Sequence, residues 1–391
     1  MTQLTQAPTD YFGELSNDSE YYIGMMSGTS LDALDAVLCQ FDEHGKPTII
    51  ATHSTPFADE LRQILLALCT PNVVQKLTQE EFSKFSELDF WGLASRLYGE
   101  LASDVVLELL NKTKLTADDI TAIGCHGQTV RHRPNWRFSL QLIDPNIIAE
   151  RTGIAVVSDF RRRDMAVGGQ GAPLVPAFHQ AIFGRGVVVL NLGGIANITV
   201  LDDKADQVIG YDTGVANLLM DGWANRHLGM PFDKNGDWAK SGTVNQTLLD
   251  ALMTHPFLAK SAPKSTGREE FNLTWLDEIL TDFTITAQDV QATLCEFTAL
   301  SASQQIQKFS HIKKLYVCGG GAYNQHLLER LGHYLPTFDI QTTDTQGISP
   351  TWVEALAFAW LARQSMLMQT GNLPAVTGAQ KGVVLGVVCF G

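Results

Sequence analysis

The chain has few cysteines and no pair of them at a spacing typical of metal or redox sites. The six cysteines are scattered, with no Cys-x-x-Cys motif, at Cys39, Cys69, Cys125, Cys295, Cys318 and Cys389. Several lie in apolar runs, where a thiol packs as a small hydrophobic group. This pattern argues against a zinc site or a disulfide scaffold, and we expect a reduced, cytoplasmic protein.

Long apolar runs are also missing. No stretch approaches the roughly 20 apolar residues that a membrane-spanning helix requires. Residues 1–20 are polar and acidic without an apolar centre, unlike a signal peptide or a membrane anchor. We therefore expect a soluble protein with no membrane partner, in which residues 1–20 form a flexible extension.

Basic residues are outnumbered. The chain has 28 Lys and Arg against 42 Asp and Glu, a formal net charge of −14 at pH 7. This charge disfavours non-specific nucleic-acid binding, and we expect no nucleic-acid partner. An anionic substrate remains compatible with it, provided that local basic residues hold the anion. Because single cores stop growing at roughly 250–300 residues, the 391-residue length predicts two domains.

Single-loop phosphate motifs are absent, but three glycine-rich turns each follow an apolar run. Neither the Walker pattern nor the dinucleotide fingerprint occurs. Glycine lets backbone amides approach an anion closely and tolerates positive φ in tight turns. The turns lie within residues 23–30, 189–194 and 315–321. Their wide spacing favours a nucleotide held between two similar halves.

The order of predicted elements supports two related halves. Residues 21–41 and 186–201 both read as strand, glycine turn, strand. Helices are predicted at 57–70, 79–110, 214–228, 243–253, 286–309, 323–333 and 351–367, and short strands at 121–125 and 154–158. We predict an α/β fold with a mixed sheet in each domain and a cleft between the domains. Domain I comprises 21–158 plus 368–391, and domain II comprises 159–367.

The first glycine turn offers groups suited to phosphate. Hydroxyls and free amides in Ser27-Gly28-Thr29-Ser30 suit a phosphate, and the following carboxylates Asp32 and Asp35 suit Mg²⁺, directly or through water. The alternative is a hairpin turn that uses glycine and serine for geometry alone.

Two carboxylates stand out further along the chain. Asp212 precedes a helical stretch, where it serves either as a helix N-cap or as a general base facing the cleft. Glu354 is the only charge in a long apolar helix start. There it interacts favourably with the helix dipole, but its apolar surroundings favour a buried carboxylate with a specific role.

Three consecutive arginines and three histidines carry further groups suited to chemistry. The run Arg161-Arg162-Arg163 follows a predicted strand, so at least one guanidinium is expected in the cleft, with a solvated basic patch as the alternative. His126, His132 and His179 show no metal-ligand spacing. Structural or substrate-binding roles are expected for them.

Ordered motifs from about Tyr22 to the carboxyl terminus resemble those of the anhydro-N-acetylmuramic acid kinases. The motifs are Gly24-x-Met26-Ser27-Gly28-Thr29-Ser30-Leu31-Asp32, Gly124-x-His126-Gly127-Gln128-Thr129, Asp159-Phe160-Arg161-Arg162-x-Asp164, Gly168-Gly169-Gln170-Gly171-Ala172-Pro173, Asn191-x-Gly193-Gly194, Asp212-x-Gly214-x-x-Asn217, Lys264-Ser265-Thr266-Gly267-Arg268-Glu269 and Val317-Cys318-Gly319-Gly320-Gly321. The resemblance implies the fold of actin, sugar kinases and heat-shock chaperone ATPases, and a homodimer. It also implies the reaction: ATP and water convert 1,6-anhydro-N-acetylmuramic acid to N-acetylmuramic acid 6-phosphate in cell-wall recycling.

The resemblance also assigns site residues. It implies Asp212 as base, with Arg163 and Glu354 as catalytic neighbours. ATP is assigned to Gly28, Thr29, Ser30, Leu31, Asp32, Ala33, Leu34, Asp35, Gly193, Gly194, Gly319, Gly320 and Gly321. Mg²⁺ is expected to arrive with ATP, with Asp32 as the carboxylate that could reach it. Two positions depart from the pattern: Ala33 replaces a usual glycine and Val215 a frequent proline, so strain is expected at Ala33 if that position needs a positive φ.

Two other functions remain open at this stage. One is a nucleotide-gated binding protein of the same fold, which would need a peptide groove or polymer interface. The other is a conventional kinase acting on another amino sugar.

Overall fold

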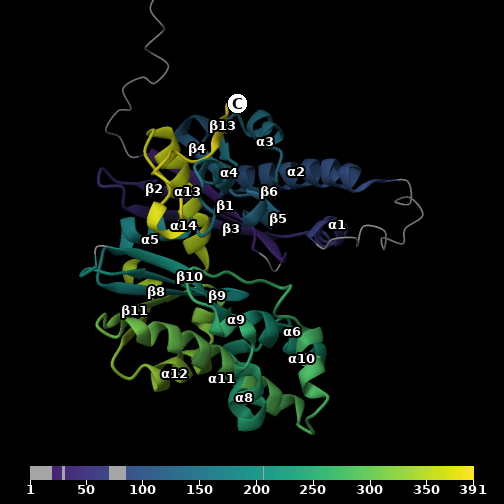
Figure 1. Cartoon of the computed structure of the whole chain (residues 1–391). Coiled ribbons are helices and arrows are strands. Elements are labelled where there is room, and N and C mark those ends of the chain that lie inside the picture. The colour runs from purple at the N-terminus through teal and green to yellow at the C-terminus, as the bar shows by residue number, and fades with distance from the viewer. Residues whose placement is uncertain (1–19, 29–30, 70–84, 206) are drawn as a thin grey trace, which may run out of the picture.

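The computed structural model describes residues 20–28, 31–69, 85–205 and 207–391. Figure 1 shows two halves stacked one above the other, each built around one sheet, with α13 between them. Thr29 and Ser30, both predicted to bind ATP, lie outside the described residues, as does all of the predicted extension except Glu20.

The first sheet has six strands in the order β13-β7-β4-β1-β2-β3. Strands β1, β2 and β3 are antiparallel, β4 and β7 continue the sheet parallel to β1, and β13 closes it antiparallel to β7. Their bounds are β1 Glu20–Met26, β2 Ala33–Phe41, β3 Pro47–Pro56, β4 Ile120–Cys125, β7 Val156–Ser158 and β13 Val387–Cys389.

The second sheet repeats this plan in five strands, ordered β10-β9-β8-β11-β12. Again three antiparallel strands are followed by two parallel ones. The bounds are β8 Val187–Leu192, β9 Ile195–Leu201, β10 Val208–Val215, β11 Lys314–Cys318 and β12 Asp339–Thr342. The predicted α/β class, the mixed sheet in each half and the repeat of strand, glycine turn and strand are confirmed. A separate hairpin, β5 Gln128–Arg133 with β6 Phe138–Leu142, was not predicted.

The helices cover both sheets and fill the space between them. Their bounds are α1 Asp59–Cys69, α2 Glu87–Thr113, α3 Pro145–Thr152, α4 Phe160–Ala166, α5 Val175–Phe183, α6 Asn217–Leu228, α7 Asp237–Ser241, α8 Gln246–Met253, α9 Pro256–Ala259, α10 Leu273–Leu280, α11 Ala287–Ile306, α12 Gln325–Tyr334, α13 Val353–Met366 and α14 Pro374–Thr377. A helix forms within each predicted range, with shifted ends; residue 70 of the first range and residues 79–84 of the second lie outside the described residues.

Alternation along the strands divides the core into three apolar layers. In β1, Ile23 faces a layer with α1 and α2, whereas Tyr22 faces a middle layer that contains α5 and α13. In β8, Val189 faces the same middle layer, and Val188 faces the layer with α6, α11 and α12. Successive strand residues point to opposite faces, so the order is helices, sheet, helices, sheet, helices.

Helix α13 lies directly on the first sheet because two glycines make room for it. Gly24 and Gly124 are register partners in β1 and β4. A Cβ at Gly24 would lie 2.0 Å from the Ala355 carbonyl oxygen, and one at Gly124 would lie 2.0 Å from the Phe358 carbonyl oxygen. The absence of both side chains fixes the depth of α13, and with it the position of Glu354 in its first turn.

The middle layer bears on the predicted domain division. Helix α13 packs between residues of both sheets, and the chain beyond it returns to the first sheet as β13. The boundaries at 158 and 367 stay a prediction, with α13 as the element shared by the two halves.

All six cysteines are unpaired, and Cys39, Cys125, Cys295 and Cys318 are buried. Among the described residues, none of the helices is long and apolar enough to cross a membrane.

Candidate active site

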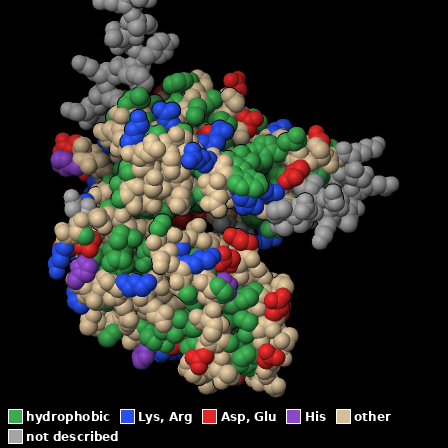
Figure 2. All heavy atoms as spheres, in the orientation of Figure 1, with side chains coloured by type: hydrophobic (Ala, Val, Ile, Leu, Met, Phe, Trp, Pro, Cys, Tyr) green, Lys and Arg blue, Asp and Glu red, His purple; other side chains and the backbone are tan. Residues whose placement is uncertain are grey.

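The space-filling view shows a hollow between the two halves (Figure 2). The second and third glycine turns meet at the ends of the neighbouring parallel strands β8 and β11. A Cβ at Gly319 would lie 2.4 Å from Asn191 Oδ1, and one at Gly321 would lie 2.6 Å from Leu192 Cβ. Gly319 also has a φ of +81°, which favours glycine. The backbones of the two turns therefore lie directly against each other and form one surface.

The second turn also starts helix α6. The Gly193 carbonyl accepts a hydrogen bond from the Asn217 amide, and the Gly194 carbonyl accepts one from the Ala216 amide, both at 3.0 Å. The Asn217 side chain donates to the Leu192 carbonyl at 2.8 Å. The structure thus brings together the predicted nucleotide residues Gly193, Gly194, Gly319, Gly320 and Gly321.

The first turn joins β1 to β2 in the other half. Leu31 takes a positive φ of 55°, and its amide donates to the Gly28 carbonyl. Ala33 is not among the residues with positive φ and begins β2 in regular pairing, so the condition for strain at this position is not met. The left-handed residue of this turn is Leu31 instead. Alanine at position 33 therefore causes no conformational strain.

Asp212 is held by strand β10 and by a loop beyond helix α9. The strand register shifts between Asp212 and Gly214, where Gly214 takes a φ of +153°. Bulges of this kind re-aim side chains beside functional sites. The Thr266 amide donates to Asp212 Oδ2 at 2.9 Å, and the Asp212 amide donates to the Lys264 carbonyl at 3.1 Å. Helix α6 starts at Asn217, so the N-cap alternative for Asp212 is wrong.

The surroundings of Asp212 favour a proton acceptor active near neutral pH. Burial raises the pKa of Asp212 to about 7, and the nearby charge of Glu269 adds to the rise. The Thr266 amide and the Lys264 ammonium oppose it. A general base works best when its pKa lies close to the working pH. Asp212 has this property.

Glu354 lies among groups from both halves. Burial raises its pKa, the charge of Arg161 lowers it, and the charge of Asp35 raises it. The Asn191 side-chain amide lies 3.5 Å from Glu354 Oε1. Glu354 occupies the first turn of α13, so the helix dipole also favours its charge.

Asp32 and Asp221 come from different halves and lie near one another. Asp221 lies on α6, and Asp32 follows the first glycine turn. Burial raises the pKa of Asp221 to about 7, and the charges of Asp32 and Asp233 add to the rise. Arg62 Nη2 lies 3.7 Å from Asp32 Oδ1. The turn predicted to hold phosphates therefore faces the helix that follows the second turn.

The comparisons with known proteins agree with these motifs. The family model for anhydro-N-acetylmuramic acid kinase matches residues 20–391. The anhydro-N-acetylmuramic acid kinase of Psychrobacter cryohalolentis is 56% identical, over 95% of this chain and 95% of that protein. The enzyme of the same name from Shewanella sp. strain MR-4 is 47% identical, over 94% of this chain and 97% of that protein. The chain belongs to the anhydro-N-acetylmuramic acid kinase family.

Solved structures match at low identity. The activator of 2-hydroxyisocaproyl-CoA dehydratase from Clostridium difficile with bound ADPNP is 14% identical, over 89% of this chain and 96% of that one, with a TM-score of 0.46. A ROK family glucokinase from Streptomyces griseus in complex with glucose and AMPPNP is 14% identical, over 88% of this chain and 99% of that one, with a TM-score of 0.37.

In this member of the anhydro-N-acetylmuramic acid kinase family, Arg161 is the arginine whose charge lowers the pKa of Glu354. Arg161 Nε donates to His126 Nε2 at 3.0 Å, and its Nη1 donates to the Gly171 carbonyl at 2.8 Å. Arg163 is exposed on α4, and Arg162 pairs with Asp159. The catalytic role assigned to Arg163 stays a prediction, since the structure does not bring it to Glu354.

Helix geometry explains why Arg161 is partly buried while Arg163 is exposed. Successive helical residues turn by about 100°, so Arg161 and Arg163 point in nearly opposite directions. Only one of them can face inward, and the buried histidine after β4 identifies which. His126 accepts from Arg161 and packs against Phe358 with tilted rings whose centroids are 4.7 Å apart, an arrangement that suits a positioning role.

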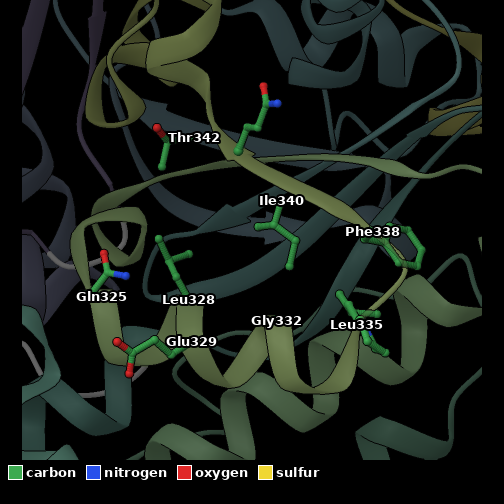
Figure 3. A pocket seen from close by; sticks show the side chains of 10 residues that line it. Gln325, Leu328, Glu329, Gly332, Leu335, Phe338, Ile340 and Thr342 are labelled. Carbon is green, nitrogen blue, oxygen red and sulfur yellow. The ribbon is translucent and has the colours of Figure 1, made fainter.

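Neither a metal cluster nor the cavity in Figure 3 accounts for the site. Within the described ranges, no group of three or more His, Cys, Asp or Glu residues could hold a metal ion. The cavity, of about 400 Å³, lies between α12 and β12. Its lining includes Leu328, Leu335 and Ile340, and none of the predicted site residues. That cavity therefore does not coincide with the predicted site residues.

Proposed function

We propose that this protein uses ATP and water to open the 1,6-anhydro ring of 1,6-anhydro-N-acetylmuramic acid. The products are N-acetylmuramic acid 6-phosphate and ADP, in the recycling of cell-wall material. The observation that carries the proposal is the Asp212 carboxylate, fixed by the Thr266 amide and with its pKa raised to about 7. A proton acceptor of that kind is needed to activate water.

The 1,6-anhydro bridge ties up both C1 and O6, so no 6-hydroxyl is free to accept a phosphoryl group. The C1–O6 bond breaks while O6 forms a bond to the γ-phosphorus of ATP, and the bond from that phosphorus to the leaving oxygen of ADP breaks. The oxygen of water forms the new bond to C1. Asp212 takes one proton from that water and later releases it to solvent, which balances the reaction.

The other predicted residues position the substrate, the water and ATP, and neutralise negative charge. Glu354 orients the attacking water or the sugar, and Arg163 holds the substrate carboxylate or balances charge on the transferring group. The glycine turns at Gly28, at Gly193 and Gly194, and at Gly319, Gly320 and Gly321 hold ATP. Their lack of side chains leaves backbone amides accessible, as phosphate binding requires.

Mg²⁺ is proposed to enter with the nucleotide. Since the described residues hold no group of three metal-ligating side chains, the phosphates of ATP supply most of the coordination. Asp32 is the carboxylate beside the first turn that would reach the ion. When bound, Mg²⁺ supplies positive charge to the transferring phosphoryl group.

Isotope labelling tests the proposed reaction. The protein is incubated with ATP and anhydromuramic acid in water enriched in oxygen-18, and the product is analysed by mass spectrometry. We expect one label at C1 and none at O6. A phosphosugar without label would support a conventional kinase, and an ATPase rate that is indifferent to sugar would support a nucleotide-gated binding protein.

We also infer a cytoplasmic homodimer. The family resemblance supports the dimer, and the unpaired cysteines fit a reducing compartment. Sedimentation should give twice the chain mass of 42.8 kDa. A sedimenting species of one chain mass at micromolar concentration would contradict the dimer.

A further inference from the structure

Arg268 lies in the loop that holds the catalytic base. This loop leaves α9 and fixes Asp212 through the Lys264 carbonyl and the Thr266 amide. Beyond Thr266 it closes a tight turn, in which the Phe271 amide donates to the Gly267 carbonyl at 3.1 Å. The backbone of the loop is therefore well fixed at Arg268.

The Arg268 side chain belongs to the second half of the molecule but faces the first. Its electrostatic neighbours are Asp32, Arg62 and Cys69. Asp32 follows the first glycine turn, and Arg62 Nε donates to the Leu31 carbonyl at 3.0 Å. Arg268 thus extends across the cleft towards the turn predicted to hold the phosphates of ATP.

Arg62 and Arg268 place two guanidinium groups beside Asp32 and the first glycine turn. Arg62 Nη2 lies 3.7 Å from Asp32 Oδ1, and Asp32 is also the carboxylate nearest in charge to Arg268. Arg268 Nε is buried and has no hydrogen-bond partner within the described part of the chain. A buried donor without an acceptor costs free energy, which an anion entering the cleft would recover.

We propose that Arg268 binds the γ-phosphoryl group of ATP from the second half of the molecule and stabilises its charge during transfer. This inference rests on the proposed function and adds a catalytic residue to it. A guanidinium matches two phosphate oxygens at once, and charge-assisted bonds of this kind are among the strongest in proteins. Because one short loop carries both Arg268 and the Thr266 amide, contact with the γ-phosphate also holds Asp212 in place.

The test compares two nucleotides that differ at the γ-position. Arg268→Gln and Arg268→Lys are titrated calorimetrically with AMP-PNP and with ADP, without sugar. We expect Arg268→Gln to weaken AMP-PNP binding by at least about tenfold, the value of one charged hydrogen bond, and ADP binding by less than about threefold. Arg268→Lys keeps the charge but loses the two-pronged hydrogen bonding of the guanidinium, so an intermediate loss of AMP-PNP affinity is expected. Arg226→Gln, which removes an exposed guanidinium paired with Asp277, serves as the matched control and should bind both nucleotides as wild type does.

Turnover supplies the second readout. For Arg268→Gln we expect kcat to fall by about 10²–10³-fold, as for loss of a transition-state donor, with added guanidinium restoring part of it. Equal losses of AMP-PNP and ADP affinity would indicate that Arg268 only forms a structural ion pair with Asp32. An unchanged kcat would exclude a catalytic role for Arg268. Wild-type turnover of the sugar tests the proposed function separately, because the nucleotide titrations contain no sugar.

Discussion

The charge on Asp212 opposes folding and is needed for chemistry. Burial raises its pKa to about 7 from the ordinary 3.8. The carboxylate form accepts a proton, whereas the protonated form is inactive as a base. We expect kcat/KM to fall about tenfold per pH unit below a midpoint near pH 7, since this ratio reports groups of the free enzyme. A kcat/KM that stays constant from pH 5 to pH 8 would rule out Asp212 as the base.

Replacement of Asp212 by Asn separates activity from stability. We expect Asp212→Asn to lower turnover by at least about 10²-fold. The folded pKa is raised, so wild type loses stability as pH rises from about 4 to 7, and the variant does not. The variant should therefore melt higher than wild type at pH 8, with the gap closing near pH 4.

Asp289 provides a control of opposite sign. Its pKa is lowered by hydrogen bonds from the Thr243 amide and the Thr286 hydroxyl. Its contribution to stability is present above its unfolded pKa and is lost as pH falls through its folded pKa. Asp289→Asn should thus melt lower than wild type at pH 8. The same direction of change in both variants would mean that burial does not control Asp212.

At the residue scale, the chemistry was more predictable than the geometry. Glu354 stood out as the only charge in an apolar helix start, and Asp212 as a carboxylate at the junction of a strand and a helix. Arg161 was not separated from Arg163, because the choice depends on where α4 begins and on His126 from a distant strand. Arg268 had no local signal, since its neighbours Asp32 and Arg62 come from the other half.

At the scale of elements, helix α13 connects packing to the site. Its depth depends on Gly24 and Gly124, and its first turn carries Glu354. We expect Gly124→Val to destabilise the protein by about 1–3 kcal/mol or more, because its Cβ would overlap the Phe358 carbonyl. Thermal and denaturant unfolding measure the loss.

Gly92 is the matched control for that substitution. It lies in α2, and a Cβ there would meet nothing within 4 Å. Gly92→Ala should stabilise the protein by about 0.4–1 kcal/mol, because alanine restricts the unfolded chain. If Gly124→Val were as stable as Gly92→Ala, α13 would not be packed against the sheet as described.

Elements with a strong period were predictable, and those formed by pairing were not. The helices and the strands β1, β2, β8 and β9 follow clear apolar patterns. Strand β10 contains Gly210, Asp212 and Gly214, which are poor strand formers, and it forms because it pairs with β9. Strand β3 is polar at many positions, since it is an edge strand.

At the scale of the whole molecule, charged groups of the two halves face one another beside the first glycine turn. Asp32 and Arg62 come from the first half, and Asp221 and Arg268 from the second. The middle apolar layer contains residues of both sheets and connects the two halves. A ligand that contacts both halves would favour a conformation in which they lie closer together.

Closure predicts cooperation between the nucleotide and the sugar. If AMP-PNP draws the halves together, sugar binding no longer has to supply the free energy of that change. The affinity for the sugar should then rise by about 5–150-fold. Calorimetric titration of the sugar with and without saturating AMP-PNP measures the factor. By linkage, the sugar must raise the affinity for AMP-PNP by the same factor, which provides an internal check. ADP lacks the γ-phosphate that Arg268 is proposed to hold, so it should give a smaller factor. Identical sugar affinities in the absence and presence of AMP-PNP would show that the two halves act independently.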